Sequence, residues 1–563
     1  MIARGDGDTT DVFLETPTSR LTTHVISLLI PLLTVKDKTV RFRSTQIIAH
    51  IINTLDSIDD ESFQLVRLGL LRRLRDKEAA VRVQAILGLG RLADEGAEDD
   101  DDDDDSDNDD AGGVLERLLD VLQNDPAADV RRALLLNLPF TPSTLPYLLE
   151  RARDFDPATR RALYARLLPA LGDFRHLSLT HREKLLRWGL RDRDEAVRKA
   201  TARLFRERWI EDCAASHQTE EEATEGEKPE GHISKPSLEA LLELLERVDV
   251  VNSGVETGVA GTAMAEFWAG RPDYLEFISF PPDYWENLTP ESAFVARTFN
   301  DFCLAAQDER TREMAGDKMP EVTRFAFLLQ KNLRILVEDV QRVALNTDPD
   351  AEEDTVAQEF CVEQMLCIAL TLDYSDEVGR RTMFSIMREA LALAELPEEC
   401  TRLVIEVLKT VSSGVGAEGE KEFCGIVLEA ISEVHDTIMG ENDTSQPGVA
   451  DEDESFHSAR SELSDDTTPK KKKGKKNAQG EEMDEEERAI REIMVNLKCL
   501  HIAQCMLQNV QYELESNAHL VTMLNNLIVP AVRSQEAPIR EKGLLCLGLC
   551  CLLSKVLNPF STP

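Results

Sequence analysis

The sequence predicts an all-α protein built from stacked helical pairs, and three observations support this fold class. Apolar residues make up 42% of the 563 residues and aromatic residues only 5%, and the prominence of Leu, Ala and Arg favours helices over strands. A short turn carrying Asp recurs along the chain. After each turn, apolar residues follow at helical spacing. Each helical pair leaves an apolar flank that only the next pair can cover, so we expect a HEAT-repeat α-solenoid with disordered acidic insertions.

The recurring turn sets the length of the repeat. It combines Asp with a later Val-Arg step at positions 37–41, 76–82, 125–131 and 192–198, with weaker copies at 156–160 and 536–540. From Arg41 the anchoring Arg recurs after 41, 49, 29 and 38 residues, and the longest step contains an acidic insertion. This spacing is typical of helical-pair repeats of about 40 residues.

Each part of the repeat has a physical reason. Asp can cap the second helix of a pair, and Pro126 and Pro157 suit a first helical position. In the second repeat the apolar residues of the two helices are expected to face each other at helical spacing. They are Phe63, Val66, Leu70 and Leu74 in the first helix, and Val81, Ala85, Leu89 and Leu92 in the second.

The Arg of the Val-Arg step is interpreted as structural. A buried guanidinium group needs a carboxylate partner. We therefore expect Arg41, Arg82, Arg131 and Arg198 to pair with the turn Asp of their own or the adjoining repeat, which favours a ladder over a binding role.

Biased segments divide the chain. Seven consecutive Asp lie within the acidic insertion, and segments of this composition do not bury enough apolar surface to fold. Shorter loops are expected at Asn346–Asp354 and Ser412–Lys421. The predicted order is N-terminal HEAT repeats over 1–212 with a disordered insertion at 94–112, an acidic linker over 213–236, a HEAT-like helical region over 237–440, a disordered Ser-, acid- and Lys-rich linker over 441–487, and the start of a C-terminal HEAT region over 488–563.

The formal charge of -41 is unevenly distributed. Residues 1–210 carry 32 basic side chains and, without the acidic run 94–110, 24 acidic ones, a net charge of +8. Residues 211–563 carry 32 basic and 68 acidic side chains, a net charge of -36. The basic part is therefore confined to the N-terminal repeats, where nucleic-acid binding stays open.

Arg and Lys recur repeat after repeat in this N-terminal part. A stack of such edges would form a basic track along which planar guanidinium groups grip phosphate oxygens. The charge pattern alone supports equally a solvated face with i, i+4 ion pairs such as Glu195 to Lys199. Lys199, Arg203 and Arg206 are expected to form one stripe along a helix. The candidate DNA-binding residues are Arg43, Arg67, Arg72, Arg73, Arg75, Lys77, Arg132, Arg161, Arg191, Arg193, Lys199, Arg203 and Arg206.

A lysine tract at 470–476 lies in the predicted linker over 441–487. It is consistent with a nuclear import signal, with a mobile phosphate-binding tether, or with a solvated charge block neutralised by nearby acids. Thr468 precedes Pro and Lys, and Ser464 precedes two Asp. Both are candidate phosphorylation sites, because a phosphate here would offset the lysines.

Motifs for catalysis are absent from the sequence. It has no phosphate-binding loop, dinucleotide fingerprint, zinc-protease motif or nucleophile elbow. We therefore expect no catalytic residues, no cofactor, no metal site and no small-molecule substrate.

The longest apolar stretches are shorter than the roughly 20 residues of a membrane span. The eleven scattered Cys are interpreted as reduced thiols of an intracellular protein.

Several stretches resemble the HEAT-repeat, non-SMC subunit of condensin, called subunit 3 or G. They run in the same order over about residues 36–557. The matching stretches are VRFR…IINTL at 40–55, LLRRLRDKEAAVRVQA at 70–85, YWENLTPESAF at 284–294, LDYSDEVGRR at 372–381 and GLLCLGLCCLL at 543–553.

The resemblance implies a non-catalytic regulatory and scaffold subunit for mitotic chromosome condensation. Such a subunit binds the kleisin chain and the phosphate backbone of double-stranded DNA or chromatin, and reaches the SMC ATPase subunits through the kleisin. It implies a nuclear and chromosomal location with a cytoplasmic pool, and no membrane. Family members are usually longer, so a truncated form is expected. The alternative is a HEAT-repeat protein scaffold, such as a nuclear transport receptor or a phosphatase scaffold.

Overall fold

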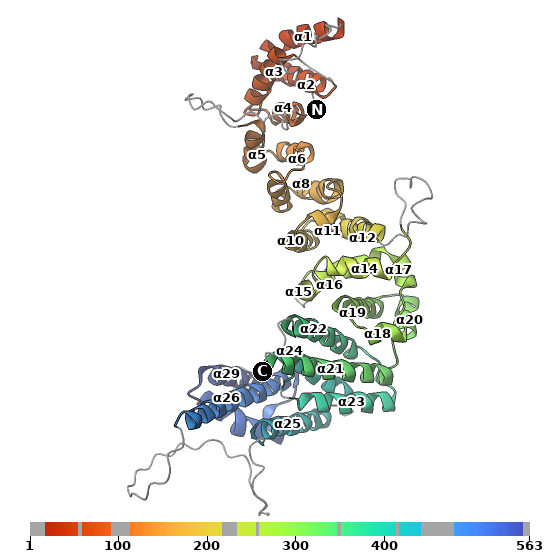
Figure 1. The fold of residues 1–563 in the computed structure, drawn as a ribbon, viewed down its shortest axis with the longest axis vertical. Helices are drawn as coiled ribbons and strands as arrows, with labels where there is room; N and C mark the ends of the chain where they lie inside the picture. The colour runs from red at the N-terminus through yellow and green to blue at the C-terminus, as the bar shows by residue number, and fades with distance from the viewer. Residues whose placement is uncertain are drawn as a thin grey trace, which may run out of the picture. The chain divides into compact units, whose positions relative to one another are not determined.

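The computed structural model consists of helices and the turns that join them in the part of the chain that it describes, namely residues 17–54, 59–91, 113–216, 234–254, 258–345, 351–393, 395–412, 416–440 and 478–554, and no strand occurs there (Figure 1). The chain divides into two compact units, Met1–Phe277 and Ile278–Pro563. The predicted all-α fold class is confirmed. In the described residues, no helix is long and apolar enough to cross a membrane.

Unit 1 consists of short helices in pairs. Its elements are α1 (Pro17–Leu29), η1 (Pro31–Thr34), α2 (Lys38–Thr54), α3 (Asp60–Arg73), α4 (Ala79–Leu89), α5 (Val114–Asn124), α6 (Ala128–Asn137), α7 (Leu145–Leu149), η3 (Glu150–Arg153), α8 (Pro157–Ala162), η4 (Leu163–Leu167), α9 (Leu168–Ala170), η5 (Phe174–His176), α10 (Leu179–Leu190), α11 (Glu195–Arg203), η6 (Leu204–Trp209), α12 (Ile210–Ser216), α14 (Leu238–Glu246), α15 (Val250–Ser253), α16 (Ala260–Gly270) and α17 (Pro272–Phe277).

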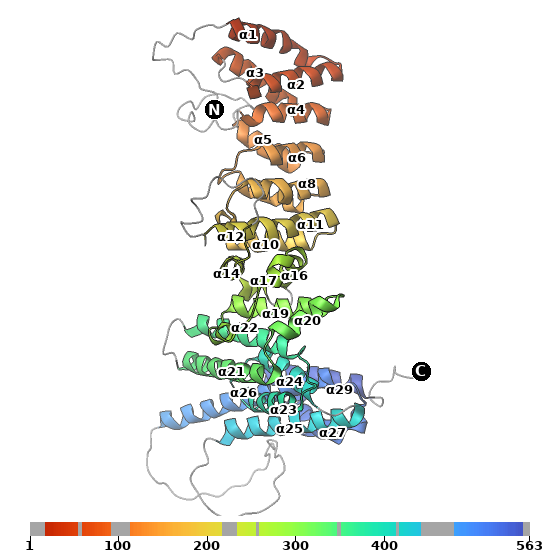
Figure 2. The ribbon, with the colours of Figure 1, turned by 90° about the vertical axis from the view of Figure 1, so that its right-hand side faces the viewer.

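The second helices of the pairs form a continuous row. Helices α2, α4, α6, α8 and α11 pack consecutively, as Figure 2 shows along unit 1. Val81 and Leu89 of α4 are buried, as are Val66 and Leu70 of α3, because these residues recur at helical spacing and meet across the α3–α4 pair. The apolar pattern that predicted the repeat thus forms the core of the repeat.

At Gly189, helix α10 packs closely against Thr201 and Tyr164. A Cβ atom at Gly189 would lie 2.6 Å from Thr201 Cγ2 and 2.8 Å from the Tyr164 ring, and both neighbours are buried. We expect Gly189→Ala to lower the unfolding free energy by about 2 kcal/mol, since overpacking a rigid core forces side chains apart. Thermal unfolding measures this loss. Gly316→Ala, where the added Cβ meets nothing within 4 Å, is the control, and an equal loss in both variants would contradict the steric account.

Unit 2 has longer helices. Its elements are α18 (Pro282–Glu286), α19 (Pro290–Ala305), α20 (Glu309–Lys318), α21 (Val322–Ala344), α22 (Ala351–Ala369), α23 (Glu377–Leu391), α24 (Glu398–Val411), α25 (Gly416–Gly440), α26 (Ala478–Asn509), η7 (Leu514–Ser516), α27 (Ala518–Met523), η8 (Leu524–Ile528), α28 (Val529–Val532) and α29 (Ala537–Leu553). Helix α24 packs against α22, α23 and α26, and α26 packs against α25 and α29.

The helices extend into several segments that the sequence predicts as linkers or loops. Helix α12 ends at Ser216 and buries Cys213 and Ala214, although 213–236 was predicted as linker. Helices α22, α25 and α26 likewise begin inside the segments Asn346–Asp354, Ser412–Lys421 and 441–487. Acidic composition does not prevent a helix whose other face is packed, as at Cys213. The insertion 94–112 and the central parts of both long linkers lie outside the described residues.

The acidic linker after α12 does not separate two compact units. Helix α14 packs against α12 across it. Arg175 joins the two sides, because its guanidinium group donates to Glu243 Oε1 at 2.7 Å and to the Asp212 carbonyl at 3.4 Å. The division between the units falls instead after Phe277. The segment that composition predicts as a linker therefore does not mark a break in the packing, because α12 and α14 remain in contact.

Asp212 is a partly buried carboxylate, and burial of its charged form destabilises the fold. Burial is the main cause that raises the pKa of Asp212 to about 6, and Asp173 adds to it, while Arg208 opposes it from 3.2 Å. Because the folded-state pKa lies above the ordinary carboxyl value, the charged form destabilises the fold at neutral pH. Stability therefore increases as the pH falls through 6 toward 4.

We expect Asp212→Asn to raise the unfolding free energy at pH 7.5 by on the order of 2 kcal/mol, and to have little effect at pH 4.5. Denaturant unfolding at the two pH values measures the difference. Asp173→Asn is the matched control with the opposite sign, because the Arg175 backbone N–H and guanidinium group overcome the effect of burial and lower the pKa of Asp173. Destabilisation by both variants at pH 7.5 would contradict this account.

Candidate nucleic-acid interface

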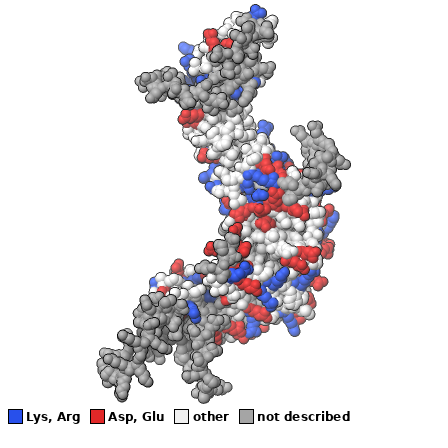
Figure 3. Space-filling model, in the orientation of Figure 1, with Lys and Arg blue, Asp and Glu red and all other residues white. Residues whose placement is uncertain are grey.

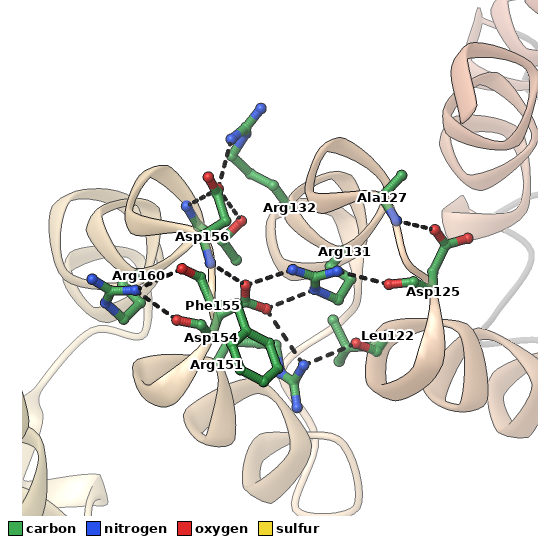
Figure 4. Close-up of polar contacts among 11 residues, drawn as sticks. Leu122, Asp125, Ala127, Arg131, Arg132, Arg151, Asp154, Phe155, Asp156 and Arg160 are labelled. Atoms are coloured by element: carbon green, nitrogen blue, oxygen red, sulfur yellow. Dashed lines mark hydrogen bonds and ion pairs between the residues drawn. The ribbon is translucent and has the colours of Figure 1, made fainter. Parts of the chain in front are cut away.

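Arg131 and Asp154 form the centre of a ladder between neighbouring turns (Figure 4). Arg131 Nε and Nη2 donate to the two Asp154 carboxylate oxygens at 2.8 and 2.7 Å, and Nη1 donates to the Asp125 carbonyl at 2.7 Å. Asp154 also accepts from the Asp156 backbone N–H at 2.9 Å. One guanidinium group therefore ties its own turn to the turn of the next repeat.

The same bidentate geometry recurs along unit 1. Arg41 pairs with Asp76, Arg82 pairs with Asp125 and Arg160 pairs with Asp192, each through Nε and Nη2. In each case Nη1 donates to the carbonyl of the residue six positions earlier. The predicted structural ladder is confirmed for Arg41, Arg82 and Arg131, and Arg160 extends it.

Arg198 departs from this pattern. Its Nη1 donates to the Asp192 carbonyl at 2.7 Å, but no ion pair joins it to a carboxylate within the described residues. Position 198 therefore keeps the contact to its own turn and lacks the contact to an adjoining Asp.

The predicted cap is confirmed at Asp37, which accepts from the Thr39 and Val40 N–H groups, whereas the turn Asp of the later repeats has a different role. Asp76, Asp125, Asp154 and Asp192 accept from the backbone N–H two residues later, inside the turn. Capping belongs to a second Asp where the turn has one: Asp156 accepts from Thr159 N–H, and Asp194 accepts from Ala196 and Val197 N–H. Helices α4 and α6 have no side-chain cap, because their turns carry a single Asp that the ladder engages.

The ladder fixes the register of the turns and so aligns their neighbouring residues. In each turn one residue stands six positions before the Arg: the ladder Asp (Asp76, Asp125, Asp154 or Asp192), or Val35 in the first repeat. The residues immediately before and after this position hold the same place in successive turns. We call this row the turn edge; its basic members are Lys36, Arg75, Lys77, Arg153, Arg191 and Arg193. All six are exposed. Because each turn is joined to the next by one Arg side chain, these cations follow one another along unit 1.

Five predicted residues are exposed cations whose side chains make no hydrogen bond or ion pair to another described residue. They are Arg72, Arg75, Lys77, Arg161 and Arg193. An exposed cation without an internal partner keeps its donors available for a phosphate. Arg75, Lys77 and Arg193 belong to the turn edge, whereas Arg72 and Arg161 lie on α3 and α8.

The other predicted residues already have partners or are partly covered. Arg73 pairs with Asp76 at 2.8 Å, Arg132 with Asp129 and Asp156, Lys199 with Glu195 at 2.6 Å and Arg203 with Glu207 at 3.4 Å. Arg43 donates to Gln46 Oε1, and Arg191 donates to the Gly258 carbonyl. Arg67 is half-buried on α3.

The predicted stripe of Lys199, Arg203 and Arg206 is exposed only in part. The Lys199 and Arg203 side chains are exposed, but Arg206 is mostly covered and lies against Gly270, where an added Cβ would touch its guanidinium group. Arg203 and Arg206 both lie near Glu207 Oε1, at 3.4 and 3.6 Å from their Nε atoms, and Arg206 belongs to the π-helical segment η6 that follows α11 directly.

Two turn-edge cations were missed at the sequence level, Lys36 and Arg153. Aligning the turns on the ladder Arg would have found both, because each stands next to the position six residues before that Arg. Arg153 also lies over the Trp188 ring, 5.6 Å from its centroid. The candidate phosphorylation sites Ser464 and Thr468 lie outside the described residues.

Acidic and basic side chains are interspersed on the face drawn in Figure 3. Within the described residues, one group could resemble a metal site: Glu359, Glu363 and Cys400, whose ligand atoms lie within 4.8 Å of one another. Burial and the neighbouring Glu359 raise the pKa of Glu363 to about 7. The sequence did not indicate this group, since α22 and α24 bring its members together.

Comparisons with known proteins agree with the fold and with the matching stretches. Residues 498–560 match the family model of the C-terminal domain of nuclear condensing complex subunits. Condensin complex subunit 3 of Schizosaccharomyces pombe is 36% identical over 523 residues, which covers 92% of this chain and 53% of that protein. The Saccharomyces cerevisiae protein of the same name is 32% identical and is covered over 49% of its length.

A solved structure is similar as well. The crystal structure of the S. pombe condensin Cnd3–Cnd2 subcomplex aligns with a TM-score of 0.71 at 34% identity, covering 96% of this chain and 56% of that chain. The chain spans about half the length of the curated relatives it matches. By sequence and by fold, the chain is a homologue of condensin complex subunit 3.

Proposed function

We propose that the chain acts as a non-catalytic subunit of a condensin complex and binds double-stranded DNA together with the kleisin. The observation that carries this proposal is the 36% identity to condensin complex subunit 3 over 92% of the chain. The aligned S. pombe protein forms a subcomplex with Cnd2, the kleisin of that complex. The SMC ATPases would be reached through the kleisin, and the location would be nuclear and chromosomal.

The DNA contacts would be made mainly to phosphate. The turn edge supplies cations in register, and the ladder holds their backbone in place. Little conformational entropy is therefore lost when DNA binds. Arg and Lys side chains at turns reach the sugar–phosphate backbone without reading base edges. The binding would therefore tolerate sequence changes, as a scaffold on chromosomes requires.

Two measurements test the proposal. The first is a salt titration of duplex DNA binding by fluorescence anisotropy, where log Kd should rise linearly with log salt concentration and two unrelated sequences should bind equally. The second is co-purification with kleisin and SMC subunits. Capture of a Ran-type GTPase or a phosphatase instead would favour the protein-scaffold alternative and would contradict the proposal.

A further inference from the structure

Phe155 is the most exposed large apolar side chain in the described part of the molecule. Its relative exposure is 90%. Full burial of a Phe side chain stabilises a fold by roughly 1.5–3 kcal/mol, and Phe155 contributes none of this to unit 1. Its backbone carbonyl is used, because Arg160 Nη1 donates to it at 3.2 Å (Figure 4). The backbone of this turn is thus fixed while the ring faces solvent.

The ladder places Phe155 on the turn edge. It directly follows the ladder Asp154, and the equivalent positions in other turns hold Lys36, Lys77, Pro126 and Arg193. An aromatic ring therefore stands where three other turns present a cation.

The surroundings of Phe155 are basic as well as aromatic. Arg153, two residues earlier, is exposed and lies over the Trp188 ring of α10. Arg191 and Arg193 flank the next ladder Asp, Asp192, to which Arg160 pairs. An apolar protein partner would require the burial of these cations beside the ring, whereas a nucleic acid would neutralise them.

We propose that Phe155 stacks on an unpaired base of DNA held along the turn edge. Proteins that bind single strands combine a basic track for the phosphates with aromatic rings for the base faces. An unpaired base offers its face freely, while entry of a ring between duplex base pairs requires unstacking at a cost of a few kcal/mol per step. The site would thus favour gapped or single-stranded DNA over intact duplex. This inference rests on the proposed function, since the turn edge must bind DNA.

Phe155→Ala tests the stacking directly. We expect its affinity for a duplex with a short single-stranded gap to fall roughly tenfold, and its affinity for intact duplex to change less than about twofold, because one stacked base contributes on the order of 1–3 kcal/mol. Phe155→Trp should retain the gap preference, and Phe155→Leu should lose it, since Leu is apolar but has no π face. The salt slope should stay unchanged in all three variants.

Phe327→Ala is the matched control, because Phe327 is also exposed, at 58%, but belongs to α21 of unit 2 and not to the turn edge. Equal losses on gapped and intact DNA, or no loss on either while the wild-type protein binds both, would overturn the stacking and leave the proposed function standing. Retention of the gap preference by Phe155→Leu would also overturn the stacking, because an apolar side chain without a π face would then be sufficient. Failure of the wild-type protein to bind any DNA would overturn both.

Discussion

Asp154→Ala is expected to lower the unfolding free energy of unit 1 by about 3–5 kcal/mol, the range found when one partner of a buried ion pair is removed. Asp154 is buried and accepts two hydrogen bonds from Arg131, one from the Asp156 backbone N–H and a longer one from Arg151. Its loss leaves the buried Arg131 guanidinium group with only the Asp125 carbonyl. The cost comes from an uncompensated buried charge.

Thermal unfolding gives the total effect, and hydrogen exchange of peptides from α6 and α8 locates it. Glu195→Ala serves as the control, because the Glu195–Lys199 pair is exposed on both sides and exposed pairs stabilise little. Uniform loosening of all helices, or an effect no larger than that of Glu195→Ala, would contradict a ladder that joins specific turns.

The ladder also has a defined pH dependence. Burial alone would raise the pKa of Asp154, but the hydrogen bonds from Arg131 and from the Asp156 N–H outweigh it and lower that pKa. The pKa values of Asp76 and Asp192 are lowered by the same kinds of contact. A lowered carboxyl pKa stabilises the fold above the unfolded-state value near 4, and this contribution is lost as the pH falls through the folded-state pKa. Asp212 acts in the opposite direction.

Local patterns predicted the repeat well, because the same kinds of contact recur in each repeat. The Val-Arg step indicated the ladder Arg at 41, 82 and 131, since a buried guanidinium group needs a carboxylate. The role of the turn Asp was less accessible, because capping and laddering both use a carboxylate at the start of a helix. The structure confirms the cap at Asp156 and shows in addition that Asp154, which precedes the predicted turn at 156–160, serves the ladder.

Features that depend on contacts between distant segments were not predictable. Arg206 fits a helical stripe by spacing, yet it is mostly covered and lies against Gly270 on α16. The acidic linker after α12 read as a domain boundary, although Arg175 and Glu243 join its two sides. Composition indicates whether a segment folds on its own. It does not indicate whether the helices on either side of the segment pack against each other.

The turn edge is expected to dominate DNA binding, and Arg75→Glu/Lys77→Glu should weaken the affinity for duplex DNA about a hundredfold at about 50 mM salt. Both residues are exposed, and neither side chain makes a hydrogen bond or ion pair to another described residue. Each phosphate contact contributes about 0.9 to the slope of log affinity against log salt concentration, so the slope should fall by about two.

The matched variant is Lys199→Glu/Arg203→Glu, which changes the net charge by the same amount on the same unit. Lys199 and Arg203 are exposed but already paired with Glu195 and Glu207, so their loss should weaken binding less than about threefold, mainly through long-range repulsion that salt screens. Anisotropy titrations of both variants at several salt concentrations separate the two cases. Equal losses of affinity in the two variants would contradict the turn-edge proposal. They would mean that DNA binding depends on the total charge of unit 1 and not on contacts at the turn-edge positions.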